Sequence, residues 1–181
     1  YYDFIIIGGG IAGASIGYEL SKLKKVLLLE REDAFGYHTT GRSAATYVEL
    51  LHNQTIVALS RASKDFLINP PDGFTQTPIL QTCACLVTAK ACEQAELNAA
   101  FQSAVKLGTE VKQLNLDEII AQVPVTRKDP DFVHSGILEP QAQRIDVDSL
   151  LQGYLRGIKK QGSTARSRAE ITYIERPKDL W

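Results

Sequence analysis

The first thirty residues contain the feature that most constrains the fold, a glycine-rich turn between two short apolar runs. Phe4–Ile7 is suited to a buried strand, and the sequence GGGIAG at 8–13 follows at once. A segment with helical periodicity extends to Leu23 and leads to a second apolar run, VLLL at 26–29, which ends on Glu30. This order predicts a dinucleotide-binding βαβ unit: a strand, the motif G-x-G-x-x-G, a helix, a second strand and a terminal acid.

Each part of this unit has a physical role. Gly8 permits the tight turn, Gly10 lets the backbone approach a pyrophosphate, and Gly13 lets the helix pack close to the strand. The unpaired N–H groups at the start of the helix, together with the helix dipole, attract phosphates. The carboxylate of Glu30 lies where it can accept hydrogen bonds from ribose hydroxyls.

Composition excludes several other classes of protein. The chain has 181 residues, 44% of them hydrophobic, and a net charge of −1, which predicts no general attraction to nucleic acid or to an anionic membrane. Its apolar runs are shorter than the about 18 residues of a membrane span. Three cysteines without a C-x-x-C motif favour a reduced, cytoplasmic protein. Cys83 and Cys85 would share one face of a strand, which would allow a metal or redox pair, but buried structural thiols are the favoured interpretation.

The rest of the chain predicts an α/β core that is interrupted by a mixed region. Asp146 and Asp148 are better explained as caps of a helix than as a catalytic carboxylate pair. His38, His52 and His134 are too scattered for a metal site, so we expect none. A long loop, 31–43, follows Glu30, and the further predicted elements are helices at 55–68, 93–107, 117–123 and 149–160 and strands at 79–87, 132–138 and 171–175.

The order of elements predicts three segments: a first cofactor-binding segment at 1–70, part of a substrate domain at 71–140, and a return segment at 141–181. There is no Met, and the alternating run at 171–175 is close to the last residue. Because a parallel dinucleotide-binding sheet needs more than two strands, we expect the chain to be the front part of a longer protein.

A second motif, TGRSAA at 40–45, is more specific than the glycines. Together with residues 8–30, this loop resembles the D-amino-acid oxidase-like family of FAD-dependent oxidoreductases, and within it the bacterial D-arginine dehydrogenases are most similar. The resemblance implies an α/β fold, with an FAD-binding Rossmann-like βαβ core and part of an inserted α+β substrate domain. It continues through 62–63, 69–71, 123–125 and 146–157.

The resemblance also implies a set of residues around an extended FAD. The pyrophosphate would lie against the glycine loop, the adenosine ribose against Glu30 with Arg31 beside the adenine, and the second loop along the pyrophosphate, ribityl chain and ring. Hydroxyls, backbone N–H groups and small residues suit the second loop to that role. The residues implied are Gly8, Gly10, Ala12, Gly13, Glu30, Arg31, Thr39, Thr40, Gly41, Arg42, Ser43, Ala44, Ala45, Thr46 and, through its main chain, Ile171.

The implied reaction is hydride transfer from the α-carbon of a D-amino acid or related amine to the flavin. The resulting imine hydrolyses to a 2-oxo acid and ammonia, and the acceptor that reoxidises the flavin is unknown. No catalytic residue is assigned, because the carboxylate-binding arginine of the family is expected beyond Trp181. We therefore expect residues 1–181 alone to be inactive.

Three positions depart from the arginine-oxidising members of the family. Cys85 stands where these enzymes have an acidic residue, Leu50-Leu51-His52 occupies the lid segment without a tyrosine, and Thr46 replaces a histidine beside the flavin. We therefore expect neutral or apolar amino acids to be better substrates than D-arginine. Two alternatives remain open: a nicotinamide-dependent dehydrogenase that uses the same βαβ unit, and a non-catalytic flavin-binding fragment.

Overall fold

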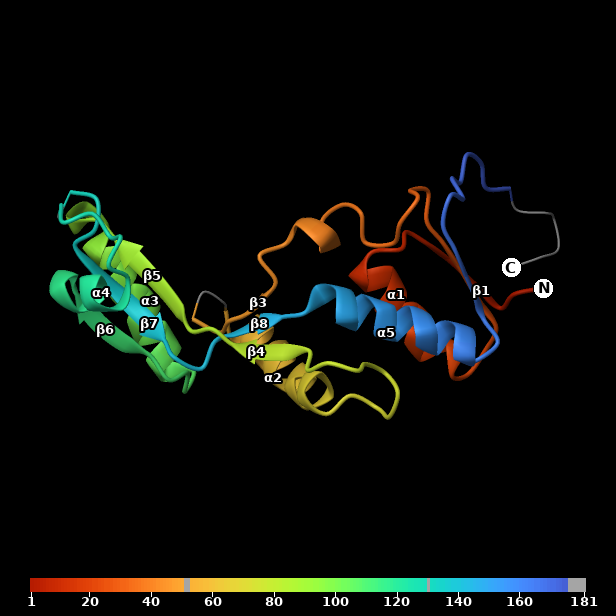
Figure 1. The fold of residues 1–181 in the computed structure, drawn as a ribbon, viewed down its shortest axis with the longest axis horizontal. Coiled ribbons are helices and arrows are strands. Elements are labelled where there is room, and N and C mark those ends of the chain that lie inside the picture. Colours follow the sequence, from red (N-terminus) through yellow and green to blue (C-terminus); the bar gives the residue numbers. More distant parts are fainter. Residues whose placement is uncertain (51–52, 130, 176–181) are drawn as a thin grey trace. The chain divides into compact units, whose positions relative to one another are not determined.

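The computed structural model describes residues 1–50, 53–129 and 131–175 (Figure 1). Contacts divide the chain into two compact units, each made of discontinuous segments. The first unit comprises Tyr1–Ala44, Pro70–Ile79 and Asp146–Trp181, and the second comprises Ala45–Asn69 and Leu80–Ile145. The segment from Ala45 to Asn69 groups with the second unit, although it lies in the range expected for the first cofactor-binding segment. The assignment of the units to cofactor and substrate domains stays a prediction.

The first unit contains the predicted βαβ arrangement. Strands β1 (Phe4–Ile7), β2 (Val26–Leu29) and β9 (Thr164–Arg166) form a parallel sheet in the order β1-β2-β9. Helix α1 (Ile11–Ser21) connects β1 to β2, and helix α5 (Val147–Lys160) precedes β9 and packs against α1. The Rossmann-like α/β core is therefore confirmed.

One face of this sheet is buried and the other is exposed. Val26 and Leu28 are fully buried, whereas Ile5 is 62% exposed and Ile7 58% exposed on the opposite face of β1. Because side chains alternate along a strand, these two residues mark one continuous uncovered side among the described residues. Parallel sheets are normally covered on both faces, so this exposed apolar surface is unusual.

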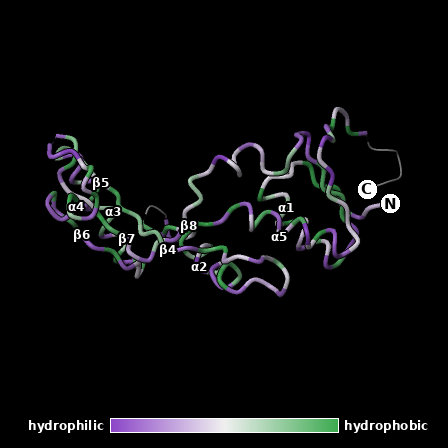
Figure 2. The backbone as a smooth tube through the Cα atoms, in the orientation of Figure 1, coloured by the Kyte–Doolittle hydropathy of each residue, from purple (hydrophilic) through white to green (hydrophobic). Residues whose placement is uncertain are grey.

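Close packing of α1 against α5 depends on small residues. A Cβ at Gly157 of α5 would lie 2.3 Å from the ring of Tyr18 of α1. The Tyr18 ring is itself enclosed by Phe74 and Tyr154, with ring centroids 5.7 and 5.5 Å away. Figure 2 shows hydrophobic and hydrophilic residues alternating along α5, as an amphipathic helix requires.

The second unit contains two antiparallel sheets. The first has the order β3-β8-β4, and the second has the order β5-β7-β6. Its strands are β3 (Thr46–Tyr47), β4 (Leu80–Thr82), β5 (Cys85–Ala89), β6 (Lys112–Asn115), β7 (Ser135–Glu139) and β8 (Gln143–Ile145). Its helices are α2 (Gln54–Ile68), α3 (Gln94–Lys106) and α4 (Leu116–Gln122). A cluster of buried residues forms a core: Leu50, Ala89, Leu97, Ala104 and Ile137.

The single strand predicted at 79–87 is wrong, because the chain forms two strands there. Ala84 adopts a left-handed backbone conformation with φ of 55°. The N–H groups of Cys83 and Ala84 both donate to the carbonyl of Ala142, at 3.2 Å each. Two residues of one segment therefore lie opposite a single residue of the other. This is the geometry of a β-bulge, which breaks the alternation on which the prediction of a shared face for the two thiols depended.

The strand predicted at 171–175 is also wrong. Those residues have no regular structure, with Tyr173 76% exposed and Ile174 60% exposed. The strand that follows α5 is β9, which begins four residues after the helix ends and pairs with β2. The apolar alternation at 171–175 predicted the strand too late in the chain. The short connection after α5 places it at Thr164–Arg166 instead.

Other differences concern caps and short strands. Asn115, not Asp117, caps α4, since its side chain accepts a hydrogen bond from the N–H of Glu118 at 3.0 Å. Asp146 caps α5 as predicted, accepting from the N–H of Ser149 at 2.9 Å. Strands β3, β6 and β8 were not predicted, because two to four residues are too few to show a periodic pattern.

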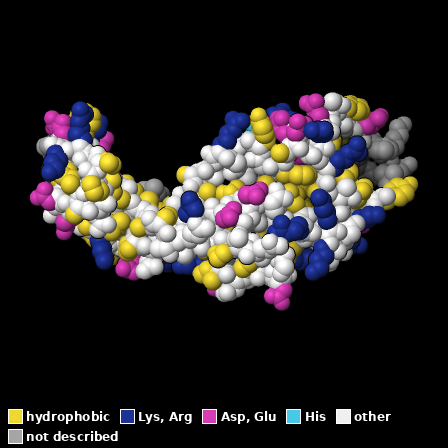
Figure 3. Space-filling view, viewed as in Figure 1, with side chains coloured by type: hydrophobic (Ala, Val, Ile, Leu, Met, Phe, Trp, Pro, Cys, Tyr) yellow, Lys and Arg dark blue, Asp and Glu magenta, His cyan; other side chains and the backbone are white. Residues whose placement is uncertain are grey.

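Charged side chains of both signs are interspersed on the visible face of the molecule (Figure 3). This distribution agrees with the net charge of −1. Within the described residues, none of the helices is long and apolar enough to cross a membrane.

We expect Gly157→Ala to lower the free energy of unfolding by about 1–3 kcal/mol, because the new methyl group would overlap the enclosed Tyr18 ring. A gain of about 1 kcal/mol in helix propensity offsets part of this loss. Denaturant unfolding of the purified protein measures the change, with exposed Lys159→Ala in the same helix as the control. A Gly157→Ala protein as stable as the wild type would contradict the packing described for α1 and α5.

Candidate cofactor site

The turn after β1 has the geometry that the glycine pattern predicts. Gly8 has φ of +105°, a conformation that other residues rarely adopt. A Cβ at Gly13 would lie 1.9 Å from the carbonyl oxygen of Gly8, so only glycine allows α1 to begin this close to the strand. Both predicted roles are therefore confirmed.

The glycine loop, residues 8–13, leaves backbone donors without partners. In the part of the chain that the structure describes, the N–H groups of Gly10, Ala12 and Gly13 donate no hydrogen bond. A Cβ at Gly10 would meet only the Thr40 hydroxyl oxygen, at 3.1 Å. The absence of side chains beside free N–H groups at the start of a helix is what a pyrophosphate requires.

Glu30 links the end of β2 to the glycine loop. Its carboxylate accepts a hydrogen bond from the N–H of Gly9 at 2.7 Å and another from the N–H of Glu32 at 3.0 Å. The residue is 8% exposed, and its backbone N–H donates to the carbonyl of Arg166 just after β2. The acid is thus held in one orientation beside the loop, with lone pairs on both oxygens left for hydroxyl donors.

A cluster of charged side chains follows Glu30. The Nε2 atom of His38 lies 2.7 Å from Oε1 of Glu32, and the Nε atom of Arg31 donates to the same oxygen at 3.0 Å. The hydrogen bond from His38 holds the pKa of Glu32 below its usual value, aided by the charges of His38 and Arg31 and opposed by burial. Arg31, expected beside the adenine, is therefore already paired, and sequence spacing gave no sign of this cluster.

The second loop turns back onto the glycine loop. Residues Thr40–Arg42 form a short 3-10 helix, and the Thr40 hydroxyl accepts a hydrogen bond from the N–H of Ile11 at 2.9 Å. Gly41 to Ala44 are exposed, and the guanidinium of Arg42 lies 5.4 Å from the centre of the Tyr37 ring. The structure thus brings Thr40 to the start of α1, as a site formed by both loops requires.

The other residues predicted to contact FAD are distributed over both units. Ala45 and Thr46 belong to the second unit, where Ala45 has φ of 51°. Ile171 lies in an irregular part of the first unit, and the lid positions Leu51 and His52 lie outside the described residues. Contact of every predicted residue with FAD stays a prediction.

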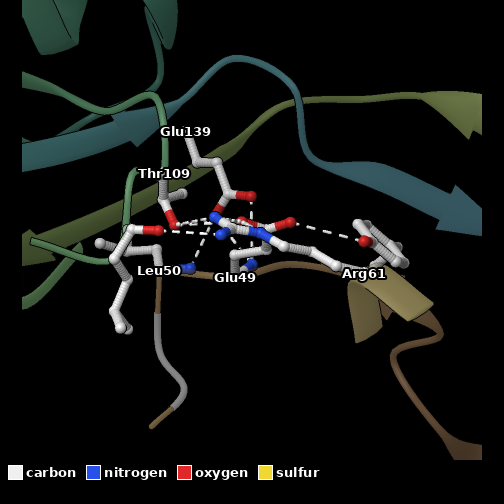
Figure 4. Close-up of polar contacts among 7 residues, drawn as sticks. Glu49, Leu50, Arg61, Thr109 and Glu139 are labelled. Carbon is white, nitrogen blue, oxygen red and sulfur yellow. Dashed lines mark hydrogen bonds and ion pairs between the residues drawn. The ribbon is translucent and has the colours of Figure 1, made fainter. Parts of the chain in front are cut away.

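Sequence inspection missed a buried polar cluster in the second unit, drawn in Figure 4. Nε and Nη2 of Arg61 donate to Oε2 of Glu49 at 3.1 and 2.6 Å, and the Thr109 hydroxyl donates to the same oxygen at 3.0 Å. Both oxygens of Glu139 accept hydrogen bonds from the N–H of Glu49 at 3.1 Å, and Oε2 accepts one from Leu50 at 2.8 Å. The partners lie 12 to 90 positions apart, so no local pattern could reveal them.

Burial and hydrogen bonding oppose each other in this cluster. Burial raises the pKa of Glu49, but the hydrogen bonds from Arg61 and Thr109, with the charges of Arg61 and Lys64, lower it below its usual value overall. Burial, followed by the charge of Glu139 and the nearby Cys83, raises the pKa of the Cys85 thiol. Cys85 and Glu139 are directly paired across β5 and β7, so a neutral thiol faces a carboxylate.

Metal-binding side chains are not gathered in the described residues. No group of three or more His, Cys, Asp or Glu side chains could hold an ion there. His38 is engaged with Glu32, and His52 lies outside the described part. The expectation that the protein needs no metal stays a prediction.

Comparison with known proteins identifies the class of protein that this fold and site define. The family model of FAD dependent oxidoreductases (DAO) matches residues 3–181. The chain belongs to this family, which confirms the resemblance and the FAD-binding fold. The narrower similarity to D-arginine dehydrogenases stays a prediction.

Similar proteins are longer than this chain. L-2-hydroxyglutarate dehydrogenase of Escherichia coli (strain K12) is 26% identical over 98% of this chain and 42% of its own length. L-alpha-glycerophosphate oxidase from Mycoplasma pneumoniae has a TM-score of 0.80 and 20% identity, over 98% of this chain and 47% of its own. Glycine oxidase from Bacillus cereus has a TM-score of 0.81 and 17% identity, over 98% and 49%. The chain therefore spans less than half the length of these proteins.

We expect the Glu49–Arg61 pair to contribute a pH-dependent part of stability. Because the folded-state pKa of Glu49 is lowered, this contribution is present above the unfolded pKa of about 4.3 and is lost as pH falls through the lower folded value. Glu49→Gln should therefore lose less stability than the wild type on acidification below about pH 4.3. At neutral pH, Arg61→Met should lower stability, because the Glu49 carboxylate loses two of its hydrogen bonds and its charged partner while Thr109 still donates to it.

Urea unfolding at a series of pH values measures both effects. Glu110→Gln is the matched control, since Glu110 lines the same surface cavity as Glu49 and Arg61 but is itself exposed. If the stability of Glu49→Gln depended on pH as that of the wild type does, the Glu49–Arg61 pair would make no pH-dependent contribution to stability.

Proposed function

We propose that the whole protein is a flavoenzyme that oxidises the α-carbon–nitrogen bond of an amino acid or related amine. The observation that carries the proposal is the glycine loop, with three free N–H groups beside a carboxylate held by Gly9. The loop at 40–45, which turns Thr40 onto the start of α1, favours FAD over a nicotinamide cofactor. When bound, FAD would supply the hydride acceptor.

The residues of this chain would bind and orient the cofactor. Gly10, Ala12 and Gly13 would donate to the pyrophosphate, and Glu30 would accept from the ribose hydroxyls. Arg42 is exposed and could pair with phosphate oxygens, since a guanidinium matches them in a bidentate manner. Ala45, Thr46 and Ile171 complete the proposed set on the strength of the family resemblance.

The second unit supports a neutral rather than a guanidinium-bearing substrate. Cys85 stands at the position of an acid in arginine-oxidising relatives, and burial keeps its thiol protonated. Glu139 faces Cys85 across the sheet, but its two oxygens already accept three hydrogen bonds. Neither group offers a free carboxylate to a cation, and an unpaired buried charge is costly.

The similarity to L-2-hydroxyglutarate dehydrogenase favours a second candidate class of substrate. A 2-hydroxy acid presents the same α-carbon and carboxylate as an amino acid, with a hydroxyl in place of the amine. The flavin chemistry would be the same hydride transfer, and the product would form directly as a 2-oxo acid. The two classes can be separated only by direct assay of substrates.

Cofactor identity is the primary test. We expect heat to release FAD, and not NAD, from the purified full-length protein. Gly10→Val should abolish retention of FAD, because the branched side chain would fill the space of the pyrophosphate. Glu30→Ala should weaken binding by about 1.5–3 kcal/mol, the range for a hydrogen bond to a charged group.

The conservative change Ile16→Val, on the exposed side of α1, is the control for Gly10→Val. The apo form of Gly10→Val should fold, since its nearest contact is a movable threonine hydroxyl. Recovery of NAD alone would favour the dehydrogenase alternative. Full flavin content in Gly10→Val would place the phosphates elsewhere.

We expect neutral or apolar D-amino acids to be oxidised faster than D-arginine. Rates of flavin reduction under anaerobic conditions, measured across D-amino acids, glycine, sarcosine and 2-hydroxy acids, test this order. Cys85→Glu should shift the preference toward basic substrates, and Cys92→Ser, an exposed thiol elsewhere, should not. A wild-type preference for D-arginine would mean that a different acid binds the guanidinium, and turnover of 2-hydroxy acids alone would favour the second class.

A further inference from the structure

Glu139 is a buried carboxylate that the proposed reaction does not use. The residue is 3% exposed, and its partners are the backbone N–H groups of Glu49 and Leu50. Within the described residues, Lys and Arg side chains form no ion pair with it. Two consecutive N–H groups donate to the same carboxylate, so the Glu139 side chain fixes the backbone at these two positions.

The same short segment is held a second time through the Glu49 side chain. Its carboxylate accepts from Arg61 and Thr109, and Nη1 of Arg61 also donates to the carbonyl of Leu107 at 2.8 Å. Three parts of the second unit, α2, the turn after α3 and β7, thus meet at Glu49 and Leu50 (Figure 4).

The segment that precedes Glu49 needs this support. Strand β3 consists of only two residues, Thr46 and Tyr47, which pair with β8. Ala45, just before it, has a left-handed backbone conformation, and its carbonyl accepts a hydrogen bond from the N–H of Ile145 at 2.6 Å. A two-residue ladder fixes the direction of a chain poorly, whereas hydrogen bonds at Ala45 on one side and at Glu49 and Leu50 on the other define both ends.

We propose that Glu139 and the Glu49–Arg61–Thr109 cluster are positioning residues that set the course of residues 45–47. This inference rests on the proposed function, in which Ala45 and Thr46 lie beside the bound flavin. Glu139 does not touch the cofactor or the substrate. It determines, through the backbone of Glu49 and Leu50, where the side chain of Thr46 stands.

Energetics favour a role beyond packing. A buried carboxylate is expensive, and apolar residues of similar volume often replace such groups without loss of stability. A charged acceptor nevertheless holds N–H donors with stronger and more directional bonds than a neutral group does. Direction is what a segment beside a reacting centre requires, because small displacements there reduce rates strongly.

The test uses the full-length flavoprotein and the isosteric variant Glu139→Gln. A glutamine side chain keeps the shape but replaces one acceptor oxygen with an N–H₂ group that faces backbone donors. We expect faster hydrogen exchange at the amides of Glu49 and Leu50. With flavin content unchanged, we also expect flavin reduction at saturating substrate to slow by about ten- to a hundredfold.

Two controls separate positioning from general destabilisation. Glu110→Gln removes an exposed charge from the cavity that Glu49 and Glu139 also line, and it should retain the wild-type rates of hydrogen exchange and flavin reduction. Ile119→Val, at the fully buried position of α4, lowers stability without touching the cluster and should leave the reduction rate unchanged. Glu139→Asp keeps the charge and should recover part of the rate.

The outcomes distinguish this inference from the proposed function. A Glu139→Gln protein that holds flavin and is reduced at the wild-type rate overturns the inference and leaves the proposed function standing. Equal slowing in Ile119→Val also overturns it, since loss of stability alone would then explain the effect. A wild-type protein without flavin overturns the proposed function, and the inference with it, before any variant is compared.

Discussion

The hydrogen bond between the N–H of Gly9 and the carboxylate of Glu30 is the contact on which the first unit depends. It joins the turn after β1 to the end of β2, and the second oxygen of the same carboxylate orders the chain at Glu32. The backbone of Glu30 is bonded to Arg166 and Ala169, so the segment after β9 is fixed as well. One acid therefore aligns the ends of β1 and β2 beside the start of α1.

This arrangement explains how one site can be both rigid and open. The helix start is close to the strand because Gly13 has no side chain, and its free N–H groups point to a space that Gly10 leaves empty. Rigid donors that need no rearrangement bind an anion at low cost in entropy. The second unit shows the same principle within the chain, where backbone N–H groups donate to an anionic side chain, that of Glu139.

Local patterns in the sequence predicted the βαβ start of the first unit, but not its third strand or the short strands of the second unit. The strands at 4–7 and 26–29 and the helix between them follow from apolar runs and glycine spacing, and Asp146 marks the start of α5 through its capping position. The bulge at Cys83 and Ala84 could not be predicted, because it depends on the carbonyl of Ala142 nearly sixty positions away. The short strands β3, β6 and β8 lack such an apolar run and form against partners distant in the sequence, so their own residues carry little signal.

The candidate site divides in the same way. The glycine loop and Glu30 are predictable because their chemistry requires fixed residue types at fixed spacing. Thr40 belongs to the TGRSAA motif, but the motif did not predict its hydrogen bond from the N–H of Ile11. That bond forms because the loop at 36–41 folds back, with the N–H of Gly41 bonded to the carbonyl of Gly36. Glu49 and Arg61 would each read as a surface charge in the sequence, and only the fold reveals that they are partners. The residues proposed to bind the cofactor thus carry a sequence pattern, whereas the residues proposed to position others become visible only through the contacts of the folded chain.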